Sequence, residues 1–112
     1  MAQSYKTLGQ VDLTTTSLTD VYTVPAATES VVSTIVIANR SATATTYSIA
    51  VRTEGDAISN KHYIASGVAL GANNSTTLTL GITVEATDVI SVSAGDANAV
   101  SVNLFGAEIT AA

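Results

Sequence analysis

An alternation of apolar and polar residues with a period of two recurs along this chain, and it restricts the fold more than any other feature. The segment TYSIAVR at 46–52 places Tyr47, Ile49 and Val51 on one face, with polar or small residues between them. The same alternation occurs at 76–84, 88–94 and 99–109. Because successive side chains of a strand point to opposite faces, the pattern predicts half-buried β-strands.

The segment VVSTIVIANR at 31–40 has a different pattern, because both of its faces are largely apolar. Strict alternation places Ile35 and Ile37 on one face and Val32 and Val36 on the other. This predicts a central strand that is covered on both sides.

Two more runs, at 18–24 and 61–70, bring the number of principal strands to seven, and 4–13 supplies an eighth. Turn residues such as Pro25, Gly71 and Gly95 separate the runs at intervals of roughly 10 to 15 residues, as in sandwiches of antiparallel strands. We therefore expect an all-β fold, a single antiparallel β-sandwich of seven or eight strands. Strand order is not readable from the sequence, so a jelly roll, an immunoglobulin-like Greek key and a simpler sandwich all remain open.

The length of 112 residues is enough for one domain with one core. We expect the sandwich to span 18–112 and the segment 1–17 to be an N-terminal arm or an edge strand. The start of the chain lacks the features of a secretory signal, and no apolar run is long enough to span a membrane, so no membrane partner is expected.

Charge and cysteine content narrow the function classes further. Nine acidic and four basic residues give a formal net charge of −5, and the basic residues are scattered. No basic face for a nucleic acid is therefore expected. With no cysteine, the chain has no disulfide and no thiolate nucleophile or metal ligand.

The segment SNKHYIASG contains the only histidine, His62, but its neighbours do not form a catalytic group. In a strand, Lys61 and Tyr63 share one face and His62 points to the other, and no second base or orienting carboxylate lies nearby. The run Glu54-Gly55-Asp56 lacks the spacing of a calcium loop, so we interpret it as an exposed acidic turn. We predict no catalytic, cofactor-binding or metal-binding residues and no enzymatic activity.

Three stretches together resemble small structural proteins of tailed bacteriophage virions, notably those of marine and cyanobacterial phages. They are VYTVPAATESVVSTIVIANRSATATTYSIAVR, ISNKHYIASGVALGANNSTTLTLGITVEATDVISVSAG and VSVNLFGAEIT, within residues 18–110. The most distinctive pieces are TVPA followed by the long Val/Ile strand and ANR, the NKHYI segment, and LTLGITV followed by a polar turn and DVI.

The resemblance implies a β-sandwich module in the virion, assembled in the host cytoplasm. A capsid decoration or cement protein is the first hypothesis, bound to the outer surface of the major capsid lattice or to other virion proteins. Weak single contacts would gain strength there from multivalent, symmetric attachment. A tail, baseplate or head-fibre protein is the second hypothesis, and a carbohydrate-binding module is the third.

The resemblance also suggests where partners bind. We expect an interface at Lys61, His62 and Tyr63, in the NKHYI segment, and at Arg40, in the ANR piece. A homo-oligomer is expected, preferably a trimer, because decoration proteins often occupy three-fold positions.

Overall fold

The structure is a computed structural model that describes residues 2–110, except for the side chains of Ala2 and Leu80. Eight strands form nearly all of its regular structure, and two short 3-10 turns, η1 (Thr53–Gly55) and η2 (Asn60–His62), lie between β4 and β5. The strands are β1 (Ala2–Leu13), β2 (Thr19–Thr23), β3 (Thr28–Asn39), β4 (Thr45–Arg52), β5 (Tyr63–Leu70), β6 (Ser75–Val84), β7 (Val89–Ala94) and β8 (Val100–Thr110).

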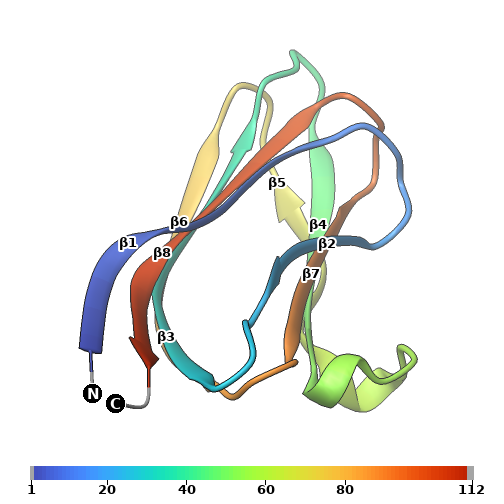
Figure 1. Cartoon of the computed structure of the whole chain (residues 1–112). Coiled ribbons are helices and arrows are strands. Elements are labelled where there is room, and N and C mark those ends of the chain that lie inside the picture. Colours follow the sequence, from blue (N-terminus) through green and yellow to red (C-terminus); the bar gives the residue numbers. More distant parts are fainter. Residues whose placement is uncertain (1, 111–112) are drawn as a thin grey trace.

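The strands form two four-stranded antiparallel sheets that pack face to face (Figure 1). One sheet has the order β1-β8-β3-β6 and the other has the order β2-β7-β4-β5. The chain changes sheet at every connection except the one between β4 and β5. This strand order is that of an eight-stranded jelly roll. The predicted all-β sandwich is therefore confirmed, and the jelly roll is the one of the expected topologies that the chain adopts.

The alternation seen in the sequence places the core between the sheets. Ile49 and Val92 are direct partners on β4 and β7, and Ile35 and Leu104 are direct partners on β3 and β8. All four side chains are fully buried. Aliphatic residues supply most of this core, so packing of β-branched side chains between two pleated surfaces is the main stabilising contribution.

The strict alternation predicted for β3 is wrong at one point. A bulge between Val32 and Thr34 adds one residue to the strand, so Val32 lies on the same buried face as Ile35 and Ile37. The strand is central in its sheet, as predicted. Its other face, with Val31 and Val36, is only partly buried, so the described part of the chain does not fully cover both faces.

The predicted start of the strand at 61–70 is also corrected. Residues 60–62 form η2, and β5 begins at Tyr63. The preceding segment folds back beside β4 and β7. Arg52 of β4 holds this segment, because its Nη1 donates to the carbonyl oxygen of Asp56 (2.9 Å). The Nη2 of Arg52 pairs with Asp20 of β2 (2.6 Å). Backbone carbonyls of the segment are thereby satisfied by a side chain of the sheet.

Candidate functional site

The structure places the four residues predicted at an interface in two separate regions. Arg40 follows directly after β3, at one end of the sandwich. Its backbone N–H donates to the carbonyl oxygen of Ala99, and its Nη2 pairs with Asp12. Lys61 and Tyr63 lie at the opposite end, in η2 and at the start of β5. The fold does not bring Arg40 together with the other residues.

His62 is buried, and its role in the isolated chain is structural. Its Nδ1 accepts a hydrogen bond from the backbone N–H of Ser59 (3.0 Å), which closes the η2 turn. The ring is therefore held as the tautomer with hydrogen on Nε2. That nitrogen is buried and has no hydrogen-bond partner among the described residues. An interface role for these residues stays a prediction.

A cluster of polar side chains links the two sheets at the edge formed by β1 and β2. The Tyr22 hydroxyl donates to Glu108 Oε2 (2.5 Å) and accepts from Ser30 Oγ (2.7 Å), and Lys6 Nζ pairs with Glu108 Oε1. Burial, followed by the hydrogen bond to Glu108, raises the pKa of Tyr22 to about 12. The hydrogen bonds from Lys6 and Tyr22 lower the pKa of Glu108.

These pKa shifts make the cluster unsuitable for acid–base chemistry near neutral pH. Tyr22 stays protonated and Glu108 stays ionised, whereas a general acid or base works best with a pKa near the operating pH.

Within residues 2–110, no group of three or more metal-ligating side chains is gathered. The helical turns of that part are also far too short to cross a bilayer.

The outer face of the β1-β8-β3-β6 sheet exposes apolar side chains without charges between them. Tyr5 and Val31 are both partners of Ala107, and Phe105 lies one row further along β8, opposite Thr7 and Thr34. Tyr5 is 79% exposed and Phe105 is 37% exposed. We call the surface formed by Tyr5, Val31, Phe105 and Val36 the neutral face.

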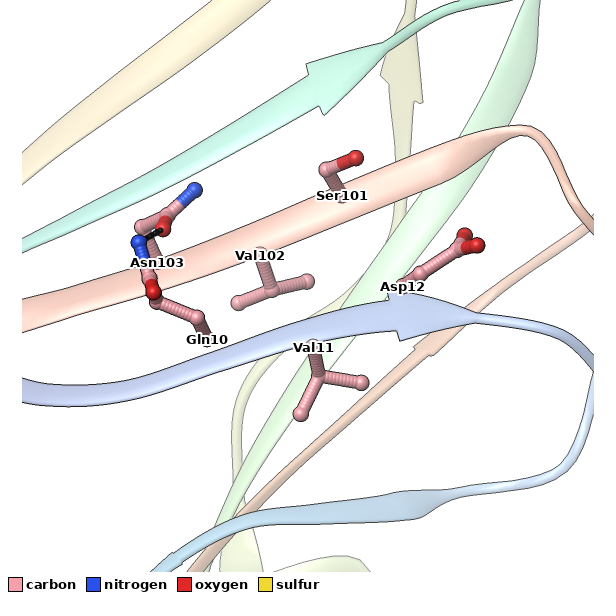
Figure 2. Close-up of a pocket in the computed structure, with 6 residues that line it drawn as sticks. All are labelled: Gln10, Val11, Asp12, Ser101, Val102 and Asn103. Atoms are coloured by element: carbon pink, nitrogen blue, oxygen red, sulfur yellow. Dashed lines mark hydrogen bonds between the residues drawn. The ribbon is translucent and has the colours of Figure 1, made fainter.

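A shallow hollow of about 270 Å³ lies over β1 and β8, beside the neutral face (Figure 2). Gln10, Val11, Asp12, Ser101, Val102 and Asn103 line it. The Gln10 Nε2 donates to Asn103 Oδ1 (2.8 Å), and Asp12 pairs with Arg40. Because these polar groups already bind one another, few of them are free to orient a small ligand.

A second, more apolar groove of about 340 Å³ opens between the sheets at the edge formed by β5 and β6. Tyr47, Ile64, Ala65, Leu78, Gly81 and Ile82 line it. We call this edge the β5–β6 side. No charged side chain lines the groove, so it can receive apolar groups but offers no group for chemistry.

Sequence reasoning missed both apolar surfaces. Tyr5 and Phe105 are one hundred residues apart, and only the pairing of β1 with β8 places them on one face. The groove depends on β5 and β6 being the last strands of their two sheets. The period-two pattern indicates which face of its strand each residue occupies. It does not indicate which strands lie next to one another in a sheet.

Comparison with solved structures finds similar folds in viral particles. A chain in the acidic stable capsid structure of Helicobacter pylori bacteriophage KHP30 has a TM-score of 0.53 and 13% identity, over 96% of this chain and 87% of that one. At this identity the similarity is one of fold.

Two weaker matches are to other viruses. A chain of infectious bursal disease virus, Gt strain, has a TM-score of 0.43 and 10% identity, over 95% of this chain and 31% of that one. A chain of the virus-like particle of Macrobrachium rosenbergii extra small virus has a TM-score of 0.34 and 11% identity, over 96% and 79%. TM-scores below 0.5 do not show a shared fold. No family model and no curated protein matches the sequence.

Proposed function

We propose that this chain is a non-enzymatic structural protein of a virion, and specifically a decoration or cement protein on the outer surface of a capsid lattice. The observation that carries the proposal is the jelly roll shared with a chain of the phage KHP30 capsid structure over most of both chains. Both chains are therefore similar in length. The match supports a jelly-roll module of a virion, and the sequence resemblance to phage virion proteins points the same way.

The physical character of the chain suits this role. Two packed sheets with short connections form a rigid unit, and ion pairs from Lys6 to Glu108, from Arg40 to Asp12 and from Arg52 to Asp20 join its parts. Such a unit binds a lattice through many weak contacts, each repeated at every symmetric position. The neutral face supplies one such contact surface, because exposed Tyr5 and Phe105 can pack against a partner without leaving a charge buried.

Position and copy number in purified virions test the role. Cryo-electron microscopy of particles that contain the protein should show it on the outer shell, and quantitative mass spectrometry should count hundreds of copies. Density confined to the tail, with a few dozen copies or fewer, would support the tail, baseplate or head-fibre alternative instead. Absence of the protein from particles would overturn both versions.

A matched pair of variants tests the neutral face. Phe105→Asp places a charge at the centre of the face and should reduce occupancy on particles by about ten-fold or more. Ala42→Asp adds the same charge to an exposed loop and should leave occupancy unchanged. Equal occupancy for the two folded variants would remove the neutral face from the proposal.

A glycan-binding role is a second candidate, and one observation favours it. Tyr5 and Phe105 lie on one sheet face, and the amides of Gln10 and Asn103 lie on the next row of the same face. Exposed aromatic rings beside amide groups are the surface on which a sugar ring can stack and form hydrogen bonds. Binding on a glycan array that Phe105→Asp abolishes would support this role, and an array without binding would remove it.

A further inference from the structure

The two sheets leave an apolar opening on the β5–β6 side. The groove there is lined by Ile64 and Ala65 from β5 and by Leu78, Gly81 and Ile82 from β6, with Tyr47 from β4 at its base. At the other edge the sheets approach closely: a Cβ added to Gly9 of β1 would lie 2.5 Å from the carbonyl oxygen of Val21 in β2. The sandwich is therefore closed at β1 and β2 and open at β5 and β6.

The opening exposes side chains that belong to the core face of the sheets. Val68 is the direct partner of the buried Tyr47, yet Val68 is 39% exposed. Leu78 is the direct partner of Ile35, which is fully buried, but Leu78 itself is only partly covered. These positions point toward the core, but within residues 2–110 no strand beyond β5 or β6 covers them.

Ile64 adds a projecting side chain to the same region. It lines the groove and is 49% exposed, which makes it more exposed than any other large aliphatic side chain described in the strands. The β5–β6 side therefore has both a cavity and an apolar group next to that cavity. A surface with both features can bind a copy of itself, each copy inserting its apolar group into the groove of the other.

Neither edge strand carries a charged residue or a proline. Monomeric proteins commonly place charged residues or proline on an edge strand, because an unprotected edge associates with other chains. Tyr63–Leu70 and Ser75–Val84 contain no charged residue and no proline. By contrast, β1 contains Lys6 and Asp12, and β2 contains Asp20.

The shape of these edges favours side-chain packing over a continuous ladder of backbone hydrogen bonds. Gly67 has a positive φ of 61° beside a register shift in β5, and β6 has a register shift between Thr79 and Ile82. Such irregularities bend a strand and interrupt regular pairing. A partner on this side is therefore held mainly by apolar contact with the groove.

Charge indicates which partner fits. The chain has a net charge of −5, so contact between two copies is least unfavourable through a surface without acidic groups. The acidic residues Glu29, Glu54, Asp56, Glu85 and Asp96 lie outside β5 and β6 and have no ion pair among the described residues. The β5–β6 side is thus a neutral surface on which two acidic copies can meet without direct repulsion.

We propose that a second copy of this chain packs against the β5–β6 side, related by a two-fold axis, with Ile64 of each copy in the groove of the other. The inference concerns the isolated chain and does not depend on a role in virions. The proposed contact gives a dimer, whereas the resemblance to phage virion proteins alone suggested a trimer. A measured oligomeric state therefore decides between the dimer and the trimer.

Sedimentation velocity over a wide range of protein concentrations tests the proposal. The unmodified chain should form a dimer, and Ile64→Lys should weaken the dimer by about ten-fold or more, because it places a charge in an apolar contact. Ile58→Lys is the matched control: Ile58 is 43% exposed but lies in the loop before η2, and its replacement should leave the dimer intact. Circular dichroism should show that both variants are folded.

The absence of cysteine from the chain allows a second, independent test. A short bis-maleimide cross-linker should join two copies of Val68→Cys far more efficiently than two copies of Ala42→Cys, which lies in an exposed loop. The proposal would be overturned if the unmodified chain stayed monomeric or formed a trimer or larger ring. A dimer that Ile64→Lys leaves intact would also overturn it. Equal cross-linking of the two cysteine variants would also contradict it.

Discussion

The two long edges of this sandwich differ in how the sheets meet. At β1 and β2 the backbones approach closely at Gly9 and Val21, and Tyr22, Ser30, Glu108 and Lys6 connect the sheets by polar contacts. At β5 and β6 an apolar groove separates the sheets, and the strands carry no charge. The first edge is complete within one chain, and the second edge has apolar surface that a partner can still cover.

This difference separates residues that stabilise the monomer from residues that are available for association. A side chain on the closed edge has its partners within the same chain, so its replacement should change the free energy of unfolding. A side chain on the open edge contacts fewer atoms of its own chain, so its replacement should change stability less and self-association more.

The largest expected effect is a loss of stability on shortening a core side chain. Ile35 on β3 and Leu78 on β6 are direct partners and allow the closed core to be compared with the open edge. Ile35→Ala removes a fully buried side chain and should lower the free energy of unfolding by about 2–5 kcal/mol. Leu78→Ala removes its cross-strand partner on the open edge, and the loss should be about 1–2 kcal/mol, because Leu78 is only partly covered. Urea denaturation of both variants as monomers measures the difference, and equal losses would mean that the edge is closed in solution.

A matched pair of glycines gives the next largest effect. Gly9→Ala puts a methyl group against the backbone carbonyl of Val21, so β1 and β2 must move apart, at a cost of about 1–3 kcal/mol. Gly81→Ala, on β6, meets no atom within 4 Å, and its effect should stay within about 0.5 kcal/mol. Thermal unfolding compares the two, and a Gly9→Ala variant as stable as Gly81→Ala would contradict the close approach.

The smallest expected effect is the pH-dependent contribution of Glu108. Its folded pKa is lower than its ordinary value of 4.5, so the contribution is fully present above about pH 4.5 and is lost as the pH falls through the folded pKa. Glu108→Gln should therefore lower stability by about 1 kcal/mol at neutral pH, because Lys6 is half exposed, and by less in acid.

An exposed carboxylate serves as the control for Glu108. Glu29→Gln, on β3, changes the same charge at a position without an ion pair among the described residues, and its stability should match that of the unmodified chain. Denaturant unfolding at neutral and acidic pH compares the three proteins. A Glu108→Gln deficit that persists unchanged in acid would show that packing, and not charge, accounts for it.

Much of the fold was predictable from the sequence, because the period-two pattern depends on local geometry. The runs around Ile49, Ile90 and Val102 each place their apolar residues on the face that the structure buries. The bulge at Ser33 was not predictable in this way, because it depends on how β8 and β6 pair with β3. The 3-10 turn before Tyr63 was also missed, because the turn is closed by the His62 side chain.

The candidate surfaces were less predictable than the fold. Lys61 and His62 stand out in the sequence because they are rare residue types in this chain, yet rarity does not indicate exposure, and His62 is buried. Tyr5 and Ile64 became candidates only when strand order was known. An exposed apolar residue on a strand looks the same in a sequence as a buried one, since both occupy alternate positions.

The position of β8 has a consequence for how the chain folds during synthesis. This strand is made after the other seven strands of the sandwich, yet it lies between β1 and β3 in its sheet (Figure 1). Before the ribosome completes it, β1 has no hydrogen-bonded neighbour, and β3 has only β6. Most contacts that close the sandwich join distant parts of the sequence, so folding should be slow and should finish only after β8 has left the ribosome.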